Sequence, residues 1–149
     1  MIRYSSEITI DRPQQVVFDA LLDPALYSQW TEMVDKTFDD PGVPTVGSRG
    51  RFRLAAGPIK GMLHMEVAEL EADRRIVIRI RHPDLAWTAV STLERVGSGT
   101  RLTYAGEVAF RGWRRLLEPF AAGAIRGGEA QEVRRLKALL EGDQASASG

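Results

Sequence analysis

The sequence predicts an α+β fold in which a seven-stranded, curved antiparallel sheet wraps around a long C-terminal helix. Three observations predict this class. A first strand is followed at once by two short helical segments, and the middle of the chain then alternates short strands with turns. After Gly112 the apolar residues change from a spacing of two to helical spacing. A chain of 149 residues suffices for one domain with one core.

The first strand is predicted at residues 3–11, where polar and apolar side chains alternate. Asp11 is expected to cap the first helix, because an acidic residue before an early helical proline is typical of a helix start. This helix should run to about Leu22. Asp23 and Pro24 then break it and start a second short helix that ends at Trp30.

Six further strands are predicted between the short helices and Gly112. Period-two alternation and turn residues place them at 33–38, 49–54, 61–70, 76–81, 86–96 and 100–110. Gly97-Ser98-Gly99 is a strong turn signal, so the last two strands should form a hairpin.

The C-terminal helix is predicted from Trp113 to about Glu141, with Pro119 either kinking it or marking its true first turn. Residues 142–149 are mostly small and polar, so a disordered tail is expected there. The domain should therefore comprise residues 1–141, without a second domain or an internal repeat.

Composition excludes several classes of function. Lys plus Arg balance Asp plus Glu at 20 each, so no net positive field attracts nucleic acid. The absence of cysteine excludes disulfides, thiolate catalysis and cysteine-ligated metals. No apolar run is long enough for a transmembrane segment, and the N-terminus is not a signal peptide, so a cytoplasmic location is expected. The composition is compatible with a monomer or a homodimer.

Few residues offer recognisable catalytic chemistry. The serine motif of an α/β-hydrolase is absent, and His64 with Glu66 falls short of the three or four ligands of a zinc site, so we expect no metal and no cofactor. His82 continues the alternation of the inward-facing residues of its strand, so its side chain is expected to point inward at the strand end. There it is either an acid or base at the cavity mouth, or a turn histidine that is hydrogen-bonded to the backbone. Ser91 and Tyr104 are the other polar candidates for catalysis.

Four phrases occur in a distinctive order. They are residues 10–18, 23–30, 66–75 and 135–141. With the order of elements, they resemble the helix-grip fold of the START and birch-pollen-allergen superfamily (SRPBCC), in its bacterial polyketide cyclase/dehydrase and lipid-transport branch. The resemblance covers residues ~3 to ~141. The superfamily has no shared catalytic motif to carry over.

The resemblance implies binding or transport of a hydrophobic small molecule, such as a lipid, isoprenoid or polyketide-like compound, in an internal cavity. Two alternatives remain: a cyclase or dehydratase acting on a polyketide-like substrate in that cavity, and a protein-interaction module like the superfamily's chaperone-ATPase activators. An open and uniformly apolar cavity would favour the carrier. An open cavity in which His82 and Tyr104 reach the same ligand atom would favour the enzyme. A collapsed cavity would favour the interaction module.

The expected ligand-binding residues are side chains on inward faces and small residues of the long helix. They are Trp30, Phe52, Leu54, Met65, Val67, Ile78, His82, Trp87, Tyr104, Phe120, Gly123 and Gly127. The two glycines are four apart and share a face with Leu116 and Phe120, so we expect them to face the cavity and leave room for a ligand.

Overall fold

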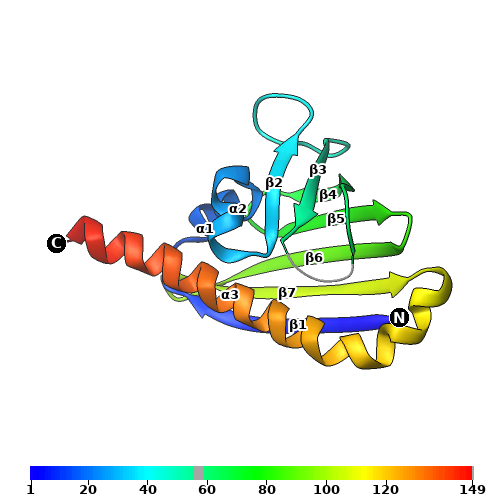
Figure 1. Cartoon of the computed structure of the whole chain (residues 1–149). Coiled ribbons are helices and arrows are strands. Elements are labelled where there is room, and N and C mark those ends of the chain that lie inside the picture. Colours follow the sequence, from blue (N-terminus) through cyan, green and yellow to red (C-terminus); the bar gives the residue numbers. More distant parts are fainter. Residues whose placement is uncertain (56–58, 149) are drawn as a thin grey trace.

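The computed structural model of the chain describes residues 1–55 and 59–148, with side chains up to residue 142 (Figure 1). The elements in chain order are β1 (Ile2–Ile10), α1 (Gln14–Leu22), α2 (Pro24–Trp30), β2 (Met33–Phe38), β3 (Arg49–Leu54), β4 (Leu63–Glu71), β5 (Arg75–His82), β6 (Leu85–Val96), β7 (Gly99–Phe110), the 3-10 helix η1 (Gly112–Leu117) and α3 (Glu118–Ser148). The predicted helix-grip arrangement is confirmed.

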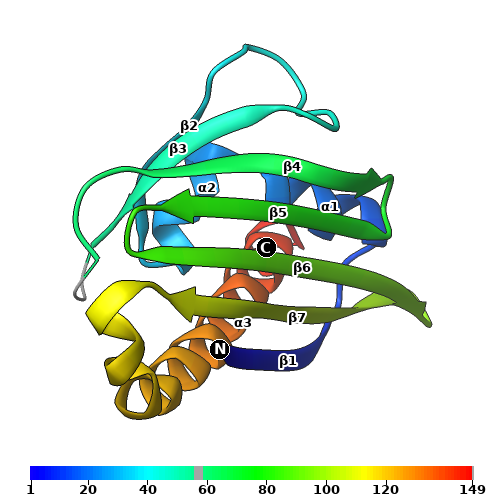
Figure 2. The same ribbon diagram turned by 90° about the vertical axis from the view of Figure 1, so that its right-hand side faces the viewer.

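The seven strands form one antiparallel sheet in the order β1-β7-β6-β5-β4-β3-β2. The sheet curves, and Figure 2 shows all three α-helices behind it, on the same side. The long hairpin of β6 and β7 lies between the edge strand β1 and the central strand β5, and its turn lies at Gly97 and Ser98 as the sequence predicts. The concave side of the sheet and the helices therefore enclose the interior.

The helix boundaries differ from the sequence expectations in two places. Asp11 does not cap α1, because the N-cap position is Pro13 and no side chain bonds there. Asp23 does cap α2, since its Oδ1 accepts a hydrogen bond from the backbone N–H of Ala25 at 3.0 Å. The predicted single C-terminal helix is divided at residue 118 into η1 and α3, and Pro119 lies in the first turn of α3, where its missing N–H costs nothing.

The C-terminal half of α3 is packed onto the sheet. Val133, Leu136 and Leu140 are buried at helical spacing. The outer edge of β1 receives hydrogen bonds from the same helix, because Arg126 and Lys137 donate to the carbonyl oxygens of Arg3 and Thr9. These contacts satisfy backbone groups that an edge strand leaves unpaired. The helix continues to Ser148, past the expected end near residue 141, and disorder of the tail stays a prediction.

Candidate functional site

The main cavity, of about 410 Å³, lies between the first half of α3 and the concave face of the sheet. Its lining is mostly apolar and comes from β2, β3, β6, β7, α3 and neighbouring loop residues: Glu32, Met33, Leu54, Ile59, Leu85, Trp87, Val108, Phe110, Ala121, Ala124, Ile125, Gly128, Glu129 and Glu132. The helix leaves this space because Ala121, Ala124 and Gly128, three and four residues apart, present small side chains to the sheet. A cavity of this size and character is typical of small-molecule sites.

The expectation that Phe120, Gly123 and Gly127 line this cavity is wrong. The Phe120 side chain is 85% exposed, and neither Gly123 nor Gly127 is among the residues that line the cavity. The expected face was anchored on the apolar residues Leu116 and Phe120, but Leu116 is exposed as well, so the face that these two residues mark is the outer one. The glycine on the cavity face is Gly128.

Two carboxylic acids, Glu129 and Glu132, line the cavity. They are only 8% and 6% exposed, and the Oε2 atom of each has no hydrogen-bond partner outside the pair among the described residues. Oε1 of Glu132 accepts a hydrogen bond from the backbone N–H of Glu32 at 3.3 Å. In the described part of the chain no basic side chain pairs with either carboxylate; the nearby Arg135 pairs with Glu32 instead, at 3.5 Å. The two carboxyl groups hydrogen-bond to each other, and the pair has no positive partner among the described residues.

Burial changes the ionisation of this pair. Loss of water, reinforced by the neighbouring Glu132 carboxylate, raises the pKa of Glu129 to about 9. Burial also raises the pKa of Glu132 above the usual range, against the smaller opposing effects of its hydrogen bonds and of Arg135. Two carboxyl groups this close cannot both ionise easily, so at neutral pH the pair retains at least one proton.

Aromatic side chains surround the acids. Trp87, a wall residue, donates its indole N–H to the Tyr4 hydroxyl at 2.9 Å. The pKa values of Tyr4 and Tyr104 are raised, chiefly by burial and then by the charge of Glu129, so both phenols stay neutral. The Tyr4 ring lies 6.2 Å from the Tyr104 ring. The acid pair therefore lies in an aromatic, weakly polar environment.

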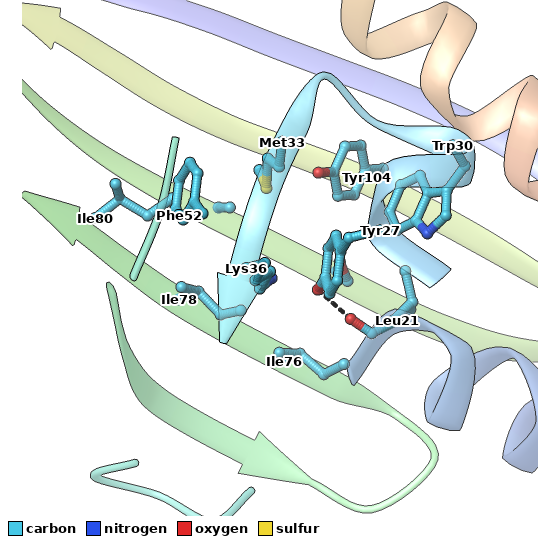
Figure 3. A pocket seen from close by; sticks show the side chains of 12 residues that line it. Leu21, Tyr27, Trp30, Met33, Lys36, Phe52, Ile76, Ile78, Ile80 and Tyr104 are labelled. Carbon is cyan, nitrogen blue, oxygen red and sulfur yellow. Dashed lines mark hydrogen bonds between the residues drawn. The ribbon is translucent and has the colours of Figure 1, made fainter. Parts of the chain in front are cut away.

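A second, inner cavity of about 30 Å³ lies behind Met33, which lines both cavities. Figure 3 shows the Tyr27 and Lys36 side chains directed into this space. The Lys36 amine stands 3.1 Å from the centre of the Tyr27 ring, and burial lowers its pKa well below the ordinary value. The pairing of β2 with β3 shifts register between Val34 and Thr37, which turns Lys36 inward.

The structure divides the other predicted wall residues between these two spaces. Leu54 and Trp87 line the main cavity, whereas Trp30, Phe52, Ile78 and Tyr104 line the inner one together with Ser91. Met65 and Val67 are buried but line neither. Their roles in ligand binding stay predictions.

His82 is bonded as a turn histidine. Its Nδ1 accepts a hydrogen bond from the backbone N–H of Asp84 at 3.0 Å, so Nε2 carries the proton and donates to the Lys60 carbonyl oxygen at 2.6 Å. Both ring nitrogens are thus occupied by backbone partners. His82 lines neither of the cavities described above, and the structure does not bring it together with Ser91 and Tyr104.

Sequence reasoning missed the acid pair and Lys36. Glu129 and Glu132 each lie four residues before a buried apolar residue, Val133 and Leu136, so a signal existed: two glutamates on the apolar face of the helix. No comparable signal marked Lys36, since strict alternation from the buried Met33 places it on the outer face.

A curved sheet that holds a long helix over an apolar cavity defines the helix-grip class of the START and birch-pollen-allergen superfamily. Residues 1–141 match the family model described as polyketide cyclase / dehydrase and lipid transport, and the chain belongs to this family. No curated protein matches the sequence significantly. Among the described residues, no helix is long and apolar enough to cross a membrane.

Solved structures of bacterial proteins share the fold. The protein MLL2253 of Mesorhizobium loti is 23% identical with a TM-score of 0.71, over 93% of this chain and 96% of that one. Mll3558 of Rhizobium loti is 25% identical with a TM-score of 0.68, over 91% and 94%. DynU16, a protein of the dynemicin biosynthetic locus, is 20% identical with a TM-score of 0.70, over 95% of this chain and 48% of that one.

Proposed function

We propose that the protein binds a hydrophobic small molecule, lipid-like or polyketide-like, in the cavity under α3. The observation that carries the proposal is the open, largely apolar space of about 410 Å³ whose lining includes the buried acids Glu129 and Glu132. Burying apolar ligand surface there provides affinity, and the acids orient its polar end. The family description and the dynemicin-locus neighbour support this class of ligand.

The geometry supports binding over the two alternatives. A collapsed cavity would favour a protein-interaction module, but this one is open. Catalysis by the predicted polar groups would need His82 and Tyr104 near one ligand atom, whereas both nitrogens of His82 bond to backbone and Tyr104 lines the inner cavity. We therefore place carrier or binding activity ahead of cyclase or dehydratase activity.

Two substitutions at neighbouring glycines test the proposal. Gly128→Phe places a ring in the cavity, while Gly127→Phe places the same ring on the exposed side of the helix. We expect the parent and the Gly127→Phe variant to bind an apolar naphthalene fluorophore equally, and Gly128→Phe to bind it at least ten times more weakly. Native mass spectrometry should show the same order for ligands retained from the expression host. Equal binding by all three proteins would contradict the proposed site.

A further inference from the structure

We propose that the natural ligand carries an amine, and that its ammonium group sits between the Glu129 and Glu132 carboxyl groups while its apolar body fills the cavity. This inference rests on the proposed function and specifies the ligand class. It starts from two acidic side chains, each more than nine-tenths buried, that line the cavity without a basic partner in the described part of the chain.

The first step is the missing positive charge. A buried carboxylate normally has a cationic or hydrogen-bonding partner, because leaving it unpaired costs far more than leaving a neutral group unpaired. The described residues supply one backbone N–H to Glu132, a hydrogen bond between the two acids, and no cation to either of them. Arg135, which contributes a weak favourable charge to Glu132, is bound to Glu32. A ligand that brings a cation completes this site.

The second step is the choice of an ammonium group over a neutral polar group. The Glu129 and Glu132 carboxyl groups share a proton in a hydrogen bond to each other, and an ammonium group can replace that proton, since it provides three donors and a charge. The nearby phenols of Tyr4 and Tyr104 remain neutral, so they supply no charge that could pair with the acids. The Trp87 ring lines the same cavity, and an aromatic ring attracts a cation more strongly than it attracts a neutral alcohol.

The experiment compares two probes that differ in one group. 2-(Naphthalen-1-yl)ethylamine and 2-(naphthalen-1-yl)ethanol share the same apolar body, and calorimetry at pH 7 measures the affinity of each. We expect the parent protein to bind the amine about tenfold or more tightly than the alcohol, because a charge-assisted hydrogen bond exceeds a neutral one. We expect this preference to vanish in the Glu129→Gln plus Glu132→Gln variant, with alcohol binding retained.

Glu141→Gln is the matched control, because it makes the same substitution on the same helix outside the cavity lining and should keep the preference for the amine. Retained alcohol binding shows that the double variant is folded. A parent protein that binds both probes equally, or a double variant that still prefers the amine, overturns the amine assignment and leaves the proposed function standing. Failure of both probes to bind the parent overturns the amine assignment together with the proposed function.

Discussion

Replacing Glu129 by glutamine should change how the stability of the protein depends on pH. In the unfolded chain this carboxyl group loses its proton near pH 4.5, whereas burial holds its pKa near 9 in the folded protein. Between these two values the folded state binds more protons than the unfolded state. The free energy of unfolding therefore falls as the pH rises through this window.

The size of the effect follows from the width of the window. A difference of one pKa unit corresponds to about 1.4 kcal/mol, so titration of a single group over the three units from pH 5 to pH 8 removes about 4 kcal/mol of stability. This is a large fraction of the 5–15 kcal/mol typical of a domain. Glutamine has nearly the same shape and no proton to lose. Glu129→Gln should remove most of this slope and be more stable than the parent at pH 8.

Urea unfolding at pH 5, 6, 7 and 8, followed by circular dichroism, measures the slope. Glu94→Gln is the control, because the Glu94 side chain is 68% exposed and its substitution should leave the pH dependence unchanged. A parent protein whose stability is constant or rises over this range would refute the reasoning. So would a Glu129→Gln variant with the parent's slope, since the titrating group would then lie elsewhere.

Three further substitutions and one control variant test the packing of the interior. Trp30→Ala should cost about 3–5 kcal/mol in urea melts, since the ring is 1% exposed and packs on two tyrosine rings; a loss below ~1 kcal/mol would contradict this. Lys36→Met should raise the free energy of unfolding by about 1–3 kcal/mol at pH 7 and by less toward pH 10. The reason is that the lowered pKa of Lys36 penalises the folded state only while the lysine of the unfolded chain is still protonated. Thermal melts at both pH values check the sign. Gly106→Ala should cost about 1–3 kcal/mol of stability, because its methyl group would overlap the Tyr4 hydroxyl. The control Gly127→Ala meets open space, so its stability should be unchanged or rise by up to ~1 kcal/mol. Equal melting temperatures of these two variants would disprove the overlap.

The strand and helix order could be predicted because it depends on local patterns. The apolar alternation of residues 3–11 and the turn at Gly97-Ser98-Gly99 are encoded in neighbouring residues, and each element of the sheet followed from such a pattern. The cap of α1 was missed because Pro13, with its fixed backbone, took the position that Asp11 was expected to fill.

The cavity wall could be predicted only in part, because it depends on the rotation of a helix and on one irregularity in a strand. Val133, Leu136 and Leu140 carried the correct helical phase, and extending it backward reaches Glu129 and Gly128. Lys36 is different. Its inward direction depends on the bulge in β2, where Asp35 takes a φ of 55°, and on the register with β3. The register of the β2–β3 pair cannot be predicted from the β2 residues alone.

The two halves of α3 differ in what they contact: one packs against the sheet, and the other lines the cavity. The half that contains Val133, Leu136 and Leu140 buries apolar side chains against the sheet and holds the helix in place. The half that begins at Glu118 presents Ala121, Ala124 and Gly128, which leaves apolar wall surface such as Ile125 unburied by the protein itself. A ligand with an apolar body would complete that burial, so its binding free energy adds to folding stability. The acid pair lies where these halves meet, close enough to the packed core to lose its water and close enough to the cavity to contact the ligand.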